Sequence, residues 1–328
     1  MRNWKRSGLR FNDAYIFLHM DNASDKRSVQ IVLPATSANL GPAFDAAALA
    51  FSMFLKVQAR SAEKFSVVAK GRDREICAQI ENHLILKTYK EVLQAEGRPV
   101  RPLALRIENQ IPIGKGCGSS AAARLAGIAL AVRFGRLRWN DSRIVYEAAQ
   151  LEHHPDNAAA CWMGGLAVAR VAKDCETQIA NVTPKGRWPL LLAVPKESLS
   201  TEAARRVLPS QYSRSDAVAN IQNSMLLLAA FFQGRKELLA SALEDRIHQP
   251  YRAPLCPLLP ALQKLAGSRG ILGSVLSGAG PSVLIFLDPK SSLSLARMRV
   301  RDGLRANGLD AELISTAITS RGASRWMR

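Results

Sequence analysis

The sequence lacks the features that mark membrane-spanning and disulfide-rich proteins. No run is long and apolar enough to cross a bilayer, and the apolar stretch at residues 15–20 is too short for the core of a signal peptide. The cysteines number five, an odd count, and none form a C-x-x-C pair, which argues against a disulfide framework and against a zinc site. These absences favour free thiols in a reducing compartment, and we expect a cytoplasmic protein.

Aromatic residues and dense basic runs are also scarce. A formal charge of +18 would ordinarily suggest a nucleic-acid partner. However, residues 1–28 contribute six Lys/Arg against three acids and residues 301–328 five against three, so most of the excess is spread through the chain. Only 6% of the residues are aromatic, and none cluster among arginines. We therefore expect no nucleic-acid or membrane partner, and interpret residues 1–28 as a flexible basic extension. A nucleic-acid-binding protein remains the alternative from a different class.

A glycine-rich loop is the most informative feature that is present. Residues 111–127 read IPIGKGCGSSAAARLAG, with glycines at 114, 116 and 118, then two serines and an alanine run that favours a helix. Glycine lets the backbone approach a ligand, and N–H groups at a helix start attract phosphate. Lys115 adds a positive charge to the loop. The pattern predicts a phosphate site, although an ordinary tight connection can have the same composition.

The length of 328 residues favours two domains, and the hydrophobic pattern predicts both helices and strands. We expect the first strand to end at Pro34, Asn82 to cap a helix, and the apolar helix 216–232 to be core. Predicted strands are residues 29–33, 54–60, 65–69, 103–107, 164–171, 188–194 and 311–316, with a further buried strand within 276–287. Predicted helices are residues 83–95, 124–134, 140–151, 199–209, 216–232, 261–267 and 294–307.

The densest polar cluster lies at residues 152–157, where Glu152, His153, His154, Asp156 and Asn157 occur together. Adjacent histidines point in different directions, and no His-x-x-x-His pair or neighbouring cysteine completes a transition-metal site. A carboxylate with an Asp–Asn pair near a helix end suits Mg²⁺ better, because Mg²⁺ takes few protein oxygens together with phosphates.

Six short motifs resemble those of the small-molecule kinase superfamily of galactokinase, homoserine kinase, mevalonate kinase and phosphomevalonate kinase, and within it the homoserine kinase family. In chain order they are SANLGPAFD, IGKGCGSSAAA, HPDN, LSTEAARRVLP, DRIHQPYR and SGAGPS. The resemblance covers residues 29–316. It implies an α+β fold with an N-terminal domain like ribosomal protein S5 domain 2 (residues 29–185), a C-terminal ferredoxin-like domain (residues 186–320), and an active site in the cleft between them.

The resemblance also implies a reaction and a set of site residues. In the presence of Mg²⁺, the enzyme would transfer a phosphate from ATP to the hydroxyl of L-homoserine, a step of threonine biosynthesis. A homodimer is the expected assembly if the protein is an oligomer. Nucleotide-binding positions would be Asn82, near the adenine, and Pro112, Gly114, Lys115, Gly116, Cys117, Gly118, Ser119 and Ser120, around the phosphates. Substrate-binding positions would be Asn39, Asp45, His154, Arg205, Arg252 and Gly278, with the two arginines on the carboxylate and Asp45 on the ammonium.

Catalysis would involve Asp156, as a base if one is needed, and Asn157, which would orient the hydroxyl. Phosphoryl transfer depends mainly on positioning and electrostatics, so we favour transfer without a strong base. The metal ligands would be Ser120 and Glu152, with Glu147 as the alternative carboxylate.

Several residues depart from the family pattern. Ala43 and His153 stand where glycine is usual, and we expect both to lie against the substrate pocket. Milder departures are Cys117, Ala158, Ala160 and Ser282. A kinase of the same superfamily acting on another small hydroxylated metabolite is therefore the main alternative. The intact glycine loop and the Asp156–Asn157 pair argue against a catalytically inactive relative.

Overall fold

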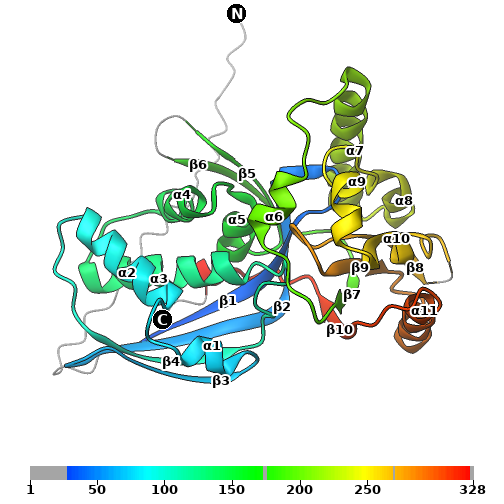
Figure 1. Cartoon of the computed structure of the whole chain (residues 1–328). Helices are drawn as coiled ribbons and strands as arrows, with labels where there is room; N and C mark the ends of the chain where they lie inside the picture. The colour runs from blue at the N-terminus through cyan, green and yellow to red at the C-terminus, as the bar shows by residue number, and fades with distance from the viewer. Residues whose placement is uncertain (1–27, 173–175, 269, 326–328) are drawn as a thin grey trace, which may run out of the picture.

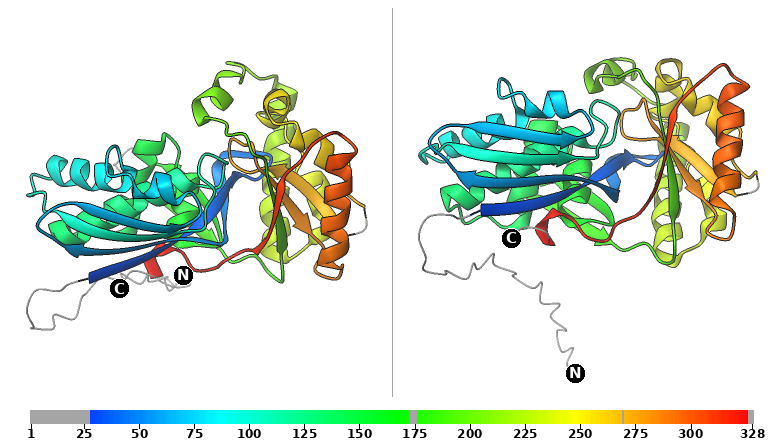
Figure 2. Two further views of the ribbon diagram at one scale, coloured as in Figure 1. Left: turned by 60° about the horizontal axis from the view of Figure 1, so that its bottom comes forward. Right: turned by 90° about the horizontal axis from the view of Figure 1, so that it is seen from below.

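Two β-sheets stand side by side, each with its own helices (Figures 1 and 2). The computed structural model describes residues 28–172, 176–268 and 270–325, so the predicted basic extension falls, except for Ser28, outside the described residues. The first sheet has the order β3-β4-β2-β5-β6, with β1 paired antiparallel to β2. The second has the order β10-β7-β9-β8. None of the described helices could cross a membrane.

The first half of the chain forms the first sheet and its helices. Its elements are β1 Ser28–Asn39, β2 Ala43–Ser61, β3 Ser66–Gly71, α1 Arg74–Ala78, α2 Leu84–Ala95, β4 Leu103–Asn109, α3 Ser119–Gly135, α4 Asp141–Glu152, α5 Asp156–Met163, β5 Leu166–Val171 and β6 Thr177–Val182. Helices α3 and α5 lie against β1 and β2, and α2 and α4 pack on α3. The predicted strands 54–60, 65–69, 103–107 and 164–171 and the three predicted helices of this half are all present.

Helix α3 is buried on nearly every side because it is apolar all round. Leu125, Ile128 and Leu130 are fully buried. Small residues let α2 approach closely: a Cβ at Gly127 would overlap the carbonyl oxygen of Ile85. The packing therefore fixes the position of the helix whose first turn carries the glycine-rich loop.

The second half forms the second sheet. Its elements are β7 Pro189–Val194, α6 Thr201–Arg206, α7 Arg214–Gln233, η1 Lys236–Leu238, α8 Leu239–Ala242, α9 Gln249–Arg252, η2 Ala253–Leu255, α10 Leu258–Gln263, β8 Ile271–Leu276, β9 Val283–Leu287, α11 Leu293–Arg305, β10 Glu312–Ala317 and η3 Ala323–Arg325. Strand β7 is covered on both faces: Leu190 and Leu192 pack with α7 and α8, and Leu191 and Ala193 pack with α10 and α11. This explains why residues 189–194 read as a continuous apolar run.

The end of the described chain returns to the first sheet (Figure 2). After β10, Ile318 forms a bridge with Phe51, and Thr319 exchanges backbone hydrogen bonds with Ala50 and Gly165. Ala323 is fully buried there. Both the first and the last described elements therefore belong to the same half of the molecule.

Several local predictions are wrong. Strand β1 does not end at Pro34 but continues to Asn39, because a shift of register between Pro34 and Ala35 accommodates the missing N–H. Asn82 does not cap α2: the residue before the helix is His83, and no side chain caps it. Asn82 instead has a positive φ of 58°.

The helix predictions in the second half need two corrections. Helix α10 begins at Leu258, three residues before the predicted start of 261. Helix α7 is only partly core, since Ile221, Met225 and Phe232 are between 63% and 68% exposed. Apolar spacing alone does not tell which apolar face is covered. Among the described elements, those not predicted are α1, α5, β6, α8, α9, β8 and the three short 3-10 helices η1, η2 and η3.

Candidate active site

A cavity of about 480 Å³ lies between the two halves and is lined by residues of both. Most of the predicted site residues line it: Asn39, Asp45, Asn82, Gly114, Gly116, Cys117, Gly118, Ser119, Ser120, Glu152, His154, Asp156, Asn157, Arg205, Arg252 and Gly278. Pro112 and Lys115 are not among its lining residues. The Lys115 ammonium donates a hydrogen bond to the carbonyl oxygen of Lys196.

The glycine-rich loop presents unpaired backbone donors to this cleft. Gly118 precedes α3 and accepts the first intrahelical bond, from the N–H of Ala122 at 2.9 Å. The N–H groups of Ser119, Ser120 and Ala121 therefore have no intrahelical acceptor. No side chain caps the helix, and its first turn has no acidic residue. The start of this 17-residue helix, with free N–H groups and the positive end of the helix dipole, is suited to an anion such as a phosphate chain.

The loop keeps its shape because two glycines touch neighbouring backbone and side chains. Gly116 and Gly118 have φ values of 75° and 71°, a region that favours glycine. A Cβ at Gly116 would overlap the Ser277 carbonyl oxygen, and one at Gly118 would overlap Thr36 Oγ1. The Ser277 hydroxyl also donates to the Gly116 carbonyl at 2.7 Å, which joins the loop to the second half.

Apolar side chains also line the cleft. They are Leu55, Ile76, Leu84, Ile85, Ile107, Ile111 and Ile113. An apolar lining of this kind suits a flat heterocycle such as a nucleotide base. Sequence reasoning missed these residues because they come from separate strands, helices and loops, and each reads locally as core.

Glu152 lies beside the start of α3. Its Oε1 accepts hydrogen bonds from Ser120 Oγ at 2.6 Å and from Arg124 Nε at 2.5 Å. The Glu152 side chain is 12% exposed. A hydroxyl and a carboxylate oxygen at the phosphate end of the cleft form the kind of donor set that Mg²⁺ prefers.

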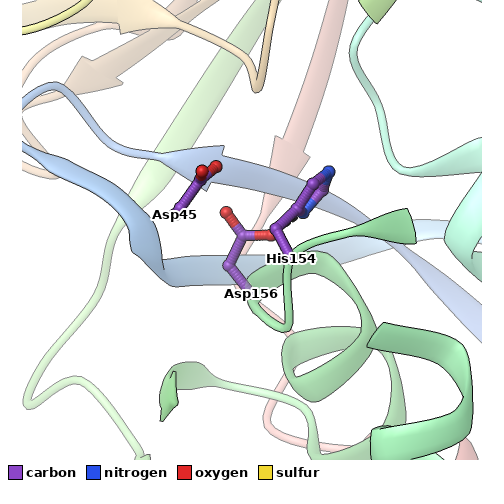
Figure 3. A group of neighbouring side chains, drawn as sticks. All are labelled: Asp45, His154 and Asp156. Carbon is purple, nitrogen blue, oxygen red and sulfur yellow. Dashed lines mark hydrogen bonds and ion pairs between the residues drawn. The ribbon is translucent and has the colours of Figure 1, made fainter. Parts of the chain in front are cut away.

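A compact acidic group lies deeper in the cleft (Figure 3). Asp45, His154 and Asp156 could each offer one ligand atom to a metal ion, and these atoms all lie within 4.8 Å of one another. Within the described ranges, no other group of three or more His, Cys, Asp or Glu side chains meets this criterion. Asp156 is fully buried, and its Oδ1 accepts from His154 Nδ1 and from the Asn157 N–H, both at 2.6 Å. Its Oδ2 has no partner among the described residues. Asn157 is held by the Thr36 hydroxyl at 2.7 Å.

The neighbouring acids favour the protonated, charged form of His154. Burial disfavours the imidazolium, but the hydrogen bond to Asp156 and the charges of Asp156, Asp45 and Glu152 outweigh it, so the pKa of His154 is raised.

Arg205 and Asp45 join the two halves across the cleft. Arg205 Nη1 and Nη2 donate to the two oxygens of Asp45 at 3.0 and 2.8 Å, a bidentate pair that is about one-third exposed. Asn39 fixes the loop beneath: its amide donates to the Gly278 carbonyl at 2.9 Å, and its Oδ1 accepts from the Asp45 N–H at 3.0 Å. Asn39 and Asp45 both have positive φ, a conformation that Asn and Asp tolerate better than most residues.

Arg252 is a buried guanidinium, 1% exposed, whose partners are uncharged groups. Its Nε donates to the Ala204 carbonyl at 3.0 Å, and its Nη1 donates to His248 Nδ1 at 3.1 Å. No carboxylate of the described part of the chain lies within 4.0 Å of it. Burial lowers the pKa of Arg252, and the nearby charge of Arg205 adds to this effect. An anionic ligand group would therefore be stabilised beside Arg252.

Comparison with known proteins identifies the family. The GHMP kinases N terminal domain matches residues 83–165, and the GHMP kinases C terminal domain matches residues 227–306. The homoserine kinase of Solibacter usitatus is 40% identical over 290 residues, which cover 88% of this chain and 94% of the relative. The chain belongs to the homoserine kinase family. The homoserine kinase of Deinococcus radiodurans is 34% identical over 92% of this chain and 97% of its own length.

Solved structures of homoserine kinase and phosphomevalonate kinase share the fold of the kinase. A crystal structure of homoserine kinase from Cytophaga hutchinsonii aligns with a TM-score of 0.76 at 24% identity, covering 93% of this chain and 99% of that one. The phosphomevalonate kinase of Streptococcus pneumoniae aligns with a TM-score of 0.64 at 14% identity, covering 90% and 100%. The kinase therefore has the two-domain α+β fold of the GHMP kinases, and ATP is its phosphate donor.

The two departures expected to lie against the substrate pocket of the kinase do not line it. Ala43 is buried at the start of β2. His153 is exposed at the end of α4 with a φ of 65°, which explains why glycine suits this position and why a histidine there leaves the cleft unchanged. Neither residue is a reason to doubt the amino-acid substrate.

The His154–Asp156 pair predicts how the stability of the kinase depends on pH. Because the folded-state pKa of His154 is raised, the pair stabilises the fold fully below about pH 6.5, the unfolded value, and this stabilisation is lost as the pH rises through the folded value. We expect the melting temperature, measured without divalent cations, to fall more between pH 6 and pH 9 in the wild type than in His154→Gln. Parallel curves for the two proteins would contradict this.

Proposed function

We propose that this kinase transfers the γ-phosphate of ATP to the hydroxyl of L-homoserine, giving O-phospho-L-homoserine for threonine biosynthesis. One observation carries the proposal: a single cleft joins an uncapped helix start, suited to a polyphosphate, with a buried guanidinium and carboxylates, suited to a zwitterionic amino acid. A sugar or an unaminated alcohol would leave those charges uncompensated.

The amino-acid end of the substrate would be held by opposite charges. Arg252 and Arg205 would bind the α-carboxylate, a task for which paired guanidinium donors are suited, and Asp45 would bind the α-ammonium. In the ligand-free protein Arg205 and Asp45 bind each other. A zwitterion can insert between them without changing the net charge of the pocket, so each group exchanges one ionic partner for another.

The hydroxyl of homoserine would be placed by Asn157 and Asp156. Thr36 fixes the Asn157 side chain, and Asp156 Oδ2 is buried with no partner of its own in the described structure. We favour phosphoryl transfer in which Asn157 orients the hydroxyl and the surrounding charges stabilise the transferring oxygens. If a proton acceptor is used, Asp156 Oδ2 is the available oxygen.

Mg²⁺ would bind through Ser120 and Glu152, whose hydroxyl and carboxylate lie together at the phosphate end of the cleft. The ion supplies positive charge to the phosphate oxygens. Glu147, the alternative, is less suitable because it does not line the cleft, whereas Glu152 does.

The remaining expectations belong to the same proposal. The first sheet and its helices would form the ribosomal protein S5 domain 2-like domain of residues 29–185. The second sheet and its helices would form the ferredoxin-like domain of residues 186–320. The last residues of that range, after β10, would belong to the first domain, because they return to its sheet. A cytoplasmic location, a homodimer and the lack of a nucleic-acid partner stay predictions.

An ADP-release assay across several acceptors tests the substrate. We expect turnover of L-homoserine, with threonine and serine weaker and mevalonate and galactose inactive. Serine and threonine both carry the hydroxyl on Cβ, one carbon nearer the α-carbon than in homoserine, and the hydroxyl of threonine is secondary, so both misplace the reacting oxygen. Turnover of a sugar without turnover of homoserine would overturn the substrate and favour another kinase of the superfamily.

A further inference from the structure

His248 is a buried imidazole that connects the two halves of the molecule. It is fully buried at the start of α9. Its Nδ1 faces the Nη1 of Arg252 at 3.1 Å, and its Nε2 faces the carbonyl oxygen of Gly41 at 2.8 Å. Its ring stacks on Phe44 with the centroids 5.2 Å apart. Both belong to the first half: Gly41 lies in the turn between β1 and β2, and Phe44 lies at the start of β2, next to Asp45.

The chemistry of these two partners fixes the state of the imidazole. A guanidinium can only donate hydrogen bonds, so Nδ1 must accept from Arg252. A carbonyl oxygen can only accept, so Nε2 must carry the proton and donate to Gly41. Only the neutral imidazole protonated at Nε2 satisfies both contacts. Protonation of Nδ1 would place an N–H against the guanidinium.

We propose that His248 is a positioning residue for substrate recognition: through one neutral ring it fixes both the Arg252 guanidinium and the loop that carries Asp45. The inference rests on the proposed function, because it takes Arg252 as the group that receives the substrate carboxylate. The guanidinium groups of Arg205 and Arg252 both lie over the Phe44 ring, at 5.6 and 5.3 Å from its centroid. The ring on which His248 stacks therefore also supports both cations.

The charges around His248 come from every neighbouring element. Asp245 Oδ2 lies 3.4 Å from its Nε2 in the preceding turn, and Arg252 faces it from α9. Asp45 acts on it from β2, and Arg205 acts on Arg252 from α6. Burial is the largest effect and lowers the pKa of His248 to about 4. Burial thus favours the neutral imidazole that both hydrogen bonds require.

Three variants separate positioning from a general packing role. His248→Leu fills a similar volume without polar atoms and should raise the homoserine KM about 10-fold, with little change in the ATP KM or in kcat. His248→Asn is neutral and polar but too short to reach both partners, and should behave similarly. His248→Gln can donate at one end and accept at the other, and should restore a KM within about threefold of the wild type.

Both kinetic and spectroscopic outcomes are decisive. Equal increases in the homoserine and ATP KM values, or a His248→Gln variant as impaired as His248→Leu, would overturn the inference. Nitrogen NMR of the wild type at pH 6 tests it without any variant: we expect a neutral His248 protonated at Nε2, and a charged imidazole would overturn it. If the wild type does not phosphorylate homoserine at all, the proposed function fails first, and the assay across acceptors reveals this independently.

Discussion

Replacing Gly118 by alanine should reduce kcat/KM for ATP by about 100-fold, because a displacement of roughly 1 Å at a reacting group costs about this much. Gly118 has a φ of 71° and immediately precedes α3. The added methyl group would overlap the hydroxyl oxygen of Thr36, which in turn holds Asn157. The change would therefore disturb the phosphate site and the proposed hydroxyl-orienting residue together.

Gly114→Ala is the matched control in the same loop. Gly114 has a similar φ of 69°, but the nearest atoms to an added Cβ are those of Ser198 at 3.5 and 3.6 Å, an ordinary contact. Alanine there adds backbone strain without an overlap, so we expect a loss smaller than 10-fold. Steady-state kinetics with varied ATP measure both variants. Equal losses of kcat/KM would mean that backbone strain, and not close approach to Thr36, explains why glycine is needed at position 118.

Replacing Arg205 by alanine should raise the homoserine KM about 30-fold and leave the ATP KM nearly unchanged. The side chain contributes two donors to a partly buried pair with Asp45, and loss of such a charged partner costs on the order of 2 kcal/mol. The proposed phosphate site at the start of α3 does not include this guanidinium.

Arg206 provides the control because it is the next residue of the same helix. Its side chain is 72% exposed and lies 4.0 Å from Glu202, also highly exposed, so it makes only a weak surface pair. Arg206→Ala removes the same charge from α6 and should change neither KM. If Arg206→Ala raised the homoserine KM as much as Arg205→Ala, a general effect of positive charge on the substrate carboxylate, and not a specific contact with Arg205, would explain both results.

The place of the glycine-rich loop at the cleft could be predicted from the sequence because its pattern is local. Glycine spacing, serines and a helix-forming run occupy one stretch of chain, and the structure places Gly114, Gly116 and Gly118 at the cleft. Lys115 shows the limit of that reasoning. A lysine in the loop was expected to face the phosphates, but it is directed to the Lys196 carbonyl, a group 81 residues away that no local pattern reveals.

The substrate end depends on contacts between distant segments and was less predictable. The motifs named Asp45, Arg205 and Arg252, but not that Arg205 binds Asp45 or that His248 holds Arg252. His248 stands inside the DRIHQPYR motif, so its presence was a signal, although its partner Gly41 is 207 residues away. The prediction that Ala43 and His153 lie against the substrate pocket was wrong because a position next to a motif does not fix the direction of the side chain.

The return of the chain to the first sheet after β10 has a mechanical consequence. The second domain is connected to the first by two covalent segments, one between β6 and β7 and the other at residues 317–319. A body held by a single linker can swivel freely, whereas two anchored connections restrict it to a scissor-like opening about the line that joins them. Entry of the nucleotide and release of its product would then follow that single degree of freedom.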